Sequence, residues 1–168
     1  MTDVPLRRLT PRLAWDRGAV EILPGVGVDQ VKLGDAREDV EERVGPPVHP
    51  GRSRRAVYDT EPMLVISYTS DHEVELVEVG YTGDGGEEVF FDGVQLTYRF
   101  MADVVSDLEA RGHRCTPSDI GFDFLAGFAV FSMGSRHAQD LDPLADDEDE
   151  RAIVEGVSVA PYAYFVSG

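Results

Sequence analysis

The stretch GVGVDQVKLGDAREDVEERVGPP, residues 25–47, carries the strongest secondary-structure signal in this chain. Asp35 is a residue type that caps helix N-termini, since its carboxylate accepts a bond from a free backbone N–H. Glu38 follows three positions later, and its side chain can reach back to the capping residue, as in a capping box. We therefore predict a helix that begins at Asp35.

The rest of this helix is polar, but three apolar residues, four positions apart, share one face: Ala36, Val40 and Val44. Gly45 is suited to the position just after a helix, and the two prolines that follow it forbid continuation. The pattern predicts a surface helix that ends near Val44 and buries a narrow stripe.

Downstream, the sequence alternates between strand-like runs and turns. Residues 63–68 and 74–81, joined by a turn at 69–72, predict a β-hairpin. Further turns are predicted at 83–86 and 92–93. A second helix is predicted over 101–111, followed by strands at 119–124, 127–133 and 153–164.

The order helix, strands, helix, strands predicts an α+β domain, in which an antiparallel sheet has two helices on one face and a second face partly open. Val31-x-Leu33 and Val94-x-Leu96 each precede a helix, so we expect a duplicated helix–hairpin unit, with repeats at about 26–92 and 93–166. We interpret residues 1–168 as one domain, with residues 1–18 as an N-terminal arm.

The charge is strongly negative and unevenly distributed. The chain has 32 acidic residues and 15 lysines and arginines, for a net charge of −17. Residues 1–60 are balanced, so the whole excess lies in residues 61–168. Such a charge disfavours binding to nucleic acid or to an anionic membrane surface. It is also typical of proteins from salt-loving organisms, where acidity is an adaptation to the solvent.

The sequence predicts a cytoplasmic protein. Cys115 is the single cysteine, so no internal disulfide can form. The first residues lack the basic and apolar segments of a signal peptide. No apolar run approaches the length of about 20 residues that a membrane-spanning helix needs.

The acidic segment, residues 140–150, is the main candidate site, with seven acids in eleven residues. It is either a docking surface for a basic partner such as a nuclease toxin or a solvated loop between two strands. A calcium site would need the spaced acids and mid-loop glycine that this segment lacks. The candidate partner-binding residues are Asp140, Asp142, Asp146, Asp147, Glu148, Asp149 and Glu150.

Other reactive residues give no recognisable motif. The histidines are scattered and Cys115 has no second cysteine, so we predict no metal and no cofactor. His113-Arg114-Cys115 invites a nucleophile interpretation, but the sequence supplies no base or orienting group, and Cys115 is better explained by packing. Gly83-Asp84-Gly85-Gly86 lacks the Gly-Lys-Ser/Thr of a phosphate loop and fits a hairpin turn.

Residues 25–47 resemble the opening of the SmpA/BLIP-like helix–strand repeat, in which a Leu-Gly step leads into a helix that closes with Gly-x-Pro before a hairpin. The resemblance covers residues 25–81 and extends loosely into the second half. The same segment is also similar to bacterial proteins of immunity type. It implies binding by surface complementarity and carries no catalytic residue. Secreted inhibitors of this kind have signal peptides and disulfides, which this sequence does not show.

These features lead to a functional hypothesis with two alternatives. We expect a non-enzymatic immunity or inhibitor protein that engages a basic partner protein through an acidic surface, since opposite potentials speed encounter. The first alternative is a structural or adaptor domain whose acidity is a salt adaptation. The second is an enzyme or small-ligand binder, which would require a pocket lined by converging polar groups.

Overall fold

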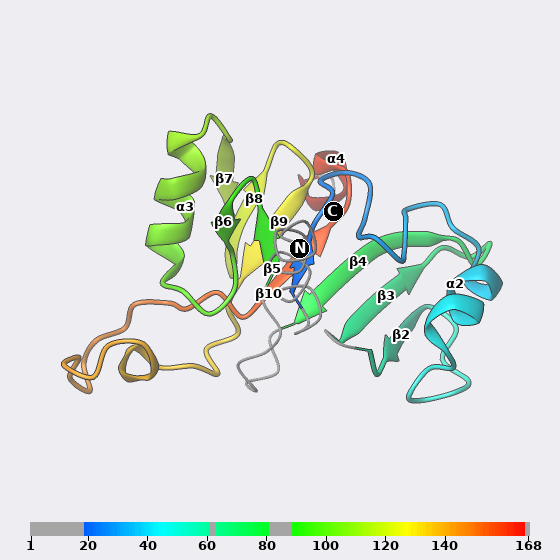
Figure 1. The fold of residues 1–168 in the computed structure, drawn as a ribbon, viewed down its shortest axis with the longest axis horizontal. Coiled ribbons are helices and arrows are strands. Elements are labelled where there is room, and N and C mark those ends of the chain that lie inside the picture. The colour runs from blue at the N-terminus through cyan, green and yellow to red at the C-terminus, as the bar shows by residue number, and fades with distance from the viewer. Residues whose placement is uncertain (1–18, 61–62, 81–88, 167–168) are drawn as a thin grey trace, which may run out of the picture.

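The computed structural model describes residues 19–60, 63–80 and 89–166. Within them the chain forms an α+β fold, as predicted, built around an antiparallel sheet (Figure 1). The predicted arm at 1–18 and the predicted turn at 83–86 lie outside the described residues.

The main sheet has seven strands in the order β2-β3-β4-β10-β9-β8-β7, and every neighbouring pair is antiparallel. β10 comes last in the sequence but lies in the centre, between β4 and β9, so the C-terminal part of the chain joins the two halves of the sheet. The strands are β2 (Arg55–Tyr58), β3 (Leu64–Tyr68), β4 (Val74–Gly80), β7 (Cys115–Pro117), β8 (Gly121–Phe124), β9 (Phe128–Phe131) and β10 (Gly156–Val159).

One face of this sheet is covered by other elements. The helices α2 (Arg37–Val44) and α3 (Met101–Ala110) contribute Val40, Val104 and Leu108 to the same core as the sheet. A small sheet of β1 (Val20–Glu21), β5 (Val89–Phe91) and β6 (Val94–Gln95) also lies there. Directly paired residues form an apolar row across this covered face: Leu64, Val79, Val157, Val130 and Phe122.

The other face, which we call the open face, is more polar. Its central row of directly paired residues is Val65, Glu78, Ser158, Ala129 and Asp123. The short helix α4 (Tyr162–Val166) lies against this face, where its Tyr162 hydroxyl contacts the Thr116 hydroxyl at 3.2 Å. The predicted arrangement, two helices on one face with the second partly open, is thus observed together with a third helix that was not predicted.

The predicted capping role of Asp35 is wrong. The residue before α2 is Ala36, with no side-chain cap. The Arg37 N–H instead donates to the carbonyl of His72, in the turn between β3 and β4. Because this turn supplies the backbone acceptor, the Asp35 carboxylate is left to accept bonds from the Lys32 N–H and the Arg43 guanidinium. The predicted end of the helix at Gly45, with φ 94°, is correct.

The predicted hairpin of 63–68 and 74–81 is confirmed over its described residues, as are the predicted turn at 92–93, which joins β5 and β6, and the second helix. The predicted strand 153–164 is partly wrong, because only β10 is extended and Pro161 precedes a helical turn. β2 and β7 were not predicted, and both are short edge strands. Five strands, β2 to β6, follow α2 before α3 begins, and four, β7 to β10, follow α3.

Candidate functional site

The acidic segment forms a loop that projects from the sheet between the short 3-10 helix η1 (Ala138–Asp140) and β10 (Figure 1). Four of its seven carboxylates accept bonds from backbone N–H groups at 2.8–3.1 Å, and so they shape the loop itself. These are Asp140 with His137, Asp142 with Leu144, Asp146 with Glu148, and Asp149 with Arg151. The structure therefore gives four of the predicted binding residues an internal role.

Arg151 neutralises part of this segment. Its guanidinium donates to Asp149 at 2.7 Å and to Asp142 at 3.0 Å, and lies 3.9 Å from the centre of the Phe100 ring. The hydrogen bonds from Arg151 hold the pKa of Asp149 below its ordinary value. Among the described residues, only Glu148 and Glu150 of the seven acids have no hydrogen bond or ion pair through the side chain, and Asp147 has one long contact at 3.4 Å with Gln139.

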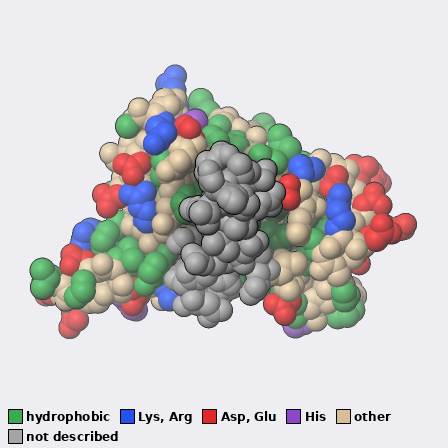
Figure 2. Space-filling view, in the orientation of Figure 1, with side chains coloured by type: hydrophobic (Ala, Val, Ile, Leu, Met, Phe, Trp, Pro, Cys, Tyr) green, Lys and Arg blue, Asp and Glu red, His purple; other side chains and the backbone are tan. Residues whose placement is uncertain are grey.

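Acidic side chains also gather at the other end of the molecule, over α2 (Figure 2). Both arginines of this helix are engaged, Arg37 with Glu41 and Arg43 with Asp35. The exposed acids of α2 have no such partner among the described residues: Glu38, Asp39 and Glu42. The acidic surface is therefore not confined to the C-terminal two-thirds of the chain, as the charge count alone implied.

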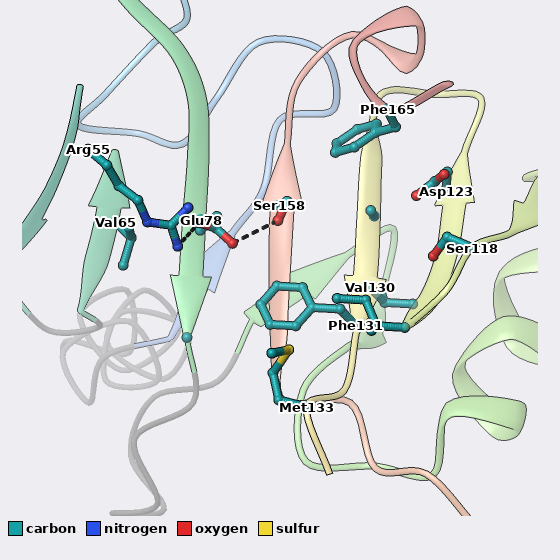
Figure 3. Close-up of a pocket in the computed structure, with 13 residues that line it drawn as sticks. Arg55, Val65, Glu78, Ser118, Asp123, Val130, Phe131, Met133, Ser158 and Phe165 are labelled. Carbon is teal, nitrogen blue, oxygen red and sulfur yellow. Dashed lines mark hydrogen bonds and ion pairs between the residues drawn. The ribbon is translucent and has the colours of Figure 1, made fainter. Parts of the chain in front are cut away.

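A groove of about 460 Å³ crosses the open face and was not predicted (Figure 3). We call it the open-face groove. Glu78 and Ser158 line its β4–β10 side, Asp123 and Ser118 line its β8 side, and Phe131 and Phe165 lie at its ends. This is the concave site on which charged and apolar side chains converge.

Glycines at neighbouring strand positions form the hollow. Gly80 pairs with Gly156, Gly156 with Phe131, and Phe131 with Gly121, so three of four positions in this row carry no side chain. A Cβ at Gly156 would overlap the Phe131 ring, which therefore lies across the glycine. Glycine within a strand often marks close approach of another group. This signal is present in the sequence, but the register was needed to bring the glycines together.

Glu78 is paired within the groove, although its buried Oε1 atom forms only an ion pair and no hydrogen bond among the described residues. Its Oε1 atom lies 2.8 Å from Nη2 of Arg55, and its Oε2 atom accepts a bond from the Ser158 hydroxyl at 3.3 Å. Figure 3 shows this chain of contacts across β2, β4 and β10. Since the charges of Arg55 and Glu78 balance, this side of the groove is close to neutral.

Asp123 differs from Glu78. It is only 9% exposed, yet its carboxylate has no hydrogen-bond or ion-pair partner among the described residues. Burial raises the pKa of Asp123 above its ordinary value. The alternation Phe122-Asp123-Phe124 places Asp123 on the open face, as a strand pattern predicts, but the sequence did not indicate its burial.

The groove is bordered by exposed apolar side chains. Ile120 is 48% exposed and Met133 is 67% exposed, and both line it. Exposed methionine and isoleucine beside a polar floor are typical of interaction surfaces. The site therefore combines an apolar border with a single unpartnered acid.

We expect Asp123→Asn to raise the thermal stability at neutral pH. A carboxyl whose pKa is raised by folding destabilises the native state once the pH exceeds its unfolded pKa, because the ionised form is then buried. The stabilising effect of the variant should shrink as the pH falls through the raised pKa of folded Asp123 and should be absent below the ordinary pKa of aspartate. Melting temperatures of both proteins across this range provide the measurement, and Asp119→Asn, on the exposed turn before β8, is the control. An equal or lower melting temperature for Asp123→Asn at neutral pH would contradict the prediction.

The other residues singled out by sequence have structural surroundings. His113 lies 2.9 Å from Asp92, with its ring 4.7 Å from that of Phe91. Burial and the charges of Glu109 and Asp123 raise the pKa of Cys115, which is opposite to what an activated thiolate needs. Within the described part of the chain, no group of three or more histidines, cysteines and acids is placed to hold a metal ion.

The aromatic residues are divided between the two faces. Phe124 and Phe128 stack at 4.6 Å in the core, whereas Phe131 lies on the open face. Phe165 of α4 lines the groove.

In the described residues, none of the helices has the length and apolar character needed to cross a membrane. No family model matches the chain, and neither a curated protein nor a solved structure shows significant similarity to it.

Proposed function

We propose that this chain is a non-enzymatic protein-binding domain of immunity or inhibitor type, and that it engages a basic partner protein in the cytoplasm. The observation that carries the proposal is the open-face groove, in which the exposed Ile120 and Met133 border the unpartnered carboxylate of Asp123. Apolar contacts at a border and one desolvated charge are the usual composition of a binding hot spot.

The charge distribution supports a basic partner. The net charge is −17, and outward acids lie both on α2 and on the acidic segment. Long-range attraction from these acids would speed encounter with a positively charged protein, and contacts in the groove would then set the lifetime of the complex. The resemblance of residues 25–81 to the SmpA/BLIP-like repeat favours the same class of function.

The salt-adaptation alternative accounts for less of the structure. Such an adaptation places acids in contact with solvent, which fits Glu38, Asp39 and Glu148. It gives no reason for an acid that is buried without a partner, as Asp123 is.

A small-ligand site is the second candidate, because the groove volume of about 460 Å³ lies in the range of small-molecule pockets. Its polar groups are mostly engaged with one another, since Glu78 is bound to both Arg55 and Ser158. This leaves Asp123 as the one acid of the groove without a partner among the described residues.

A partner-capture experiment tests the proposal. The immobilised full chain is exposed to lysate of the source organism, and retained proteins are identified, purified and titrated against three variants. We expect Met133→Asp to weaken binding about tenfold or more through faster dissociation, since it places a charge on the apolar border. The combined change Asp147→Asn, Glu148→Gln and Glu150→Gln should reduce the association rate and its salt dependence instead.

Leu144→Asp is the matched control, because Leu144 is 93% exposed on the acidic segment and does not line the groove. It should leave the dissociation rate unchanged. If the retained protein is acidic, or if neither the groove variant nor the acid variant alters its binding, the proposal is wrong.

A further inference from the structure

The carboxylate of Asp123 differs from those of two other partly shielded acids in the described part of the chain. Glu155 accepts bonds from the Ser132 hydroxyl and from the backbone N–H groups of Met133, Ser135 and Arg136. Glu78 is paired with Arg55 and Ser158. Glu78 and Glu155 are half-buried, whereas Asp123 is only 9% exposed, but no described residue donates to it.

The sheet around Asp123 has no side chain that donates to it. Its directly paired neighbours are Ala129 on β9 and Thr116 on β7, and the Thr116 hydroxyl is in contact with Tyr162. The nearby Ser118 hydroxyl accepts a bond from the Gly121 N–H. The Asp123 carboxylate lines the open-face groove, and burial raises its pKa, so hydrogen-bond donors brought into the groove by a bound molecule would stabilise its ionised form.

The walls of the groove select the kind of donor. Phe131 and Phe165 present aromatic rings, and Val65 and Met133 add apolar surface (Figure 3). A guanidinium group is more weakly hydrated than an ammonium group and stacks on aromatic rings, and its planar fork matches a carboxylate. The apolar stem of an arginine would lie along these walls while its charged end reaches Asp123.

We propose that the open-face groove binds an arginine side chain of the partner protein, with the Asp123 carboxylate accepting two hydrogen bonds from the guanidinium. This inference rests on the proposed function, since it names the chemistry by which that partner is recognised. Glu78 does not compete for the same guanidinium, because Arg55 already neutralises it.

The test uses short acetylated and amidated peptides, and so it does not depend on finding the partner. Gly-Leu-Arg-Leu-Gly is titrated into the isotope-labelled full chain and followed by the backbone amide signals in NMR spectra. Matched peptides carry citrulline, which has the shape of arginine without its charge, or lysine. We expect saturable shifts at amides of β8, β9 and Met133, with citrulline binding about tenfold more weakly and lysine in between.

Asp123→Asn should abolish the preference for arginine over citrulline, and this variant is expected to fold because it removes a buried charge. Asp119→Asn should retain the preference, since this exposed acid lies outside the groove. Equal binding of the arginine and citrulline peptides by the natural chain would overturn the inference, as would an unchanged preference in Asp123→Asn.

Residues 1–18 of the chain contain four arginines, any of which could compete with a partner's arginine for the groove. A full-length variant that removes all four tests this: Arg7→Gln, Arg8→Gln, Arg12→Gln and Arg17→Gln combined. Peptide binding that appears only in this variant would overturn the inference in favour of the chain's own N-terminal segment.

The two proposals can fail separately. A captured basic partner that depends on Met133 but shows no arginine preference at Asp123 would sustain the proposed function and refute this inference. Arginine-specific peptide binding without any captured protein would sustain the groove assignment and point to a free small ligand instead.

Discussion

Phe128→Ala is expected to lower the free energy of unfolding by about 3–5 kcal/mol, which is the usual cost of removing a buried phenylalanine ring. Phe128 is fully buried at the centre of the covered face. Its ring stacks on Phe124 with 4° between the planes, and its edge contacts Phe91 at 5.3 Å. The substitution would therefore leave a cavity where the main sheet meets the small sheet.

Urea denaturation of the two proteins checks this expectation through the shift of the midpoint at constant slope. Val48→Ala, at a half-exposed position outside the core, should change the stability by less than about 0.5 kcal/mol. Phe128→Leu, which keeps most of the volume, should lose less than Phe128→Ala and would remain measurable if the alanine variant did not fold. A loss below about 1.5 kcal/mol for Phe128→Ala would mean that the ring packs less tightly than the geometry indicates.

Glu41→Ala is expected to cost about 2 kcal/mol, because Glu41 links α2 to the covered face of the sheet. Its Oε2 atom accepts bonds from the Tyr58 hydroxyl at 2.7 Å and from Arg37 at 2.8 Å. Tyr58 and Tyr68 are completely buried and their hydroxyls are 2.8 Å apart. Without Glu41, one hydroxyl of this pair would lose its acceptor and Arg37 would lose its ion pair.

The pH dependence of this effect has a definite sign. Burial alone would raise the pKa of Glu41, but the hydrogen bonds from Tyr58 and Arg37, with the charge of Arg37, lower it overall. The lowered pKa means that this group stabilises the fold above its unfolded pKa, and that the contribution is lost as the pH falls through the folded value.

Unfolding free energies of the natural chain and Glu41→Ala should therefore differ most near neutral pH and converge under acid conditions. Glu42→Ala is the control on the same helix, since Glu42 is exposed and has no side-chain partner among the described residues. A difference between the natural chain and Glu41→Ala that is independent of pH would show that the carboxylate charge does not matter to this network.

Local sequence patterns predicted the elements whose signals are short-range. The hairpin of β3 and β4 follows from β-branched residues on both sides of a polar turn. The end of α2 at Gly45 was predictable because the two prolines that follow directly forbid a longer helix. The class of the fold follows from the order of these elements.

The edge strands and the helix start depended on longer-range contacts. β2 and β7 each extend only because a neighbouring strand supplies hydrogen-bond partners on one side. The sequence predicted that Asp35 caps the helix, but the first N–H of α2, that of Arg37, instead donates to the carbonyl of His72, which lies in a turn 37 positions after Asp35. Propensity is a weak prior wherever a tertiary contact offers the same hydrogen bond.

The candidate site shows the same division. The acids of residues 140–150 are evident in the sequence, but only folding brings Arg151 onto Asp142 and Asp149 and turns several carboxylates toward backbone N–H groups. The charge count therefore overstated how much of this segment is available to a partner.

The sequence by itself determined the acidity of this protein, its α+β class and the position of its main helices and hairpins, since each depends on composition or on neighbours in the chain. Only the tertiary structure decided that β10 lies between β4 and β9. That placement aligns Gly80, Gly156 and Gly121 around Phe131 and sets Asp123 in the groove beside them. The physical reason is strand register, which fixes the face and neighbours of every side chain and is set by pairing between segments far apart in the sequence.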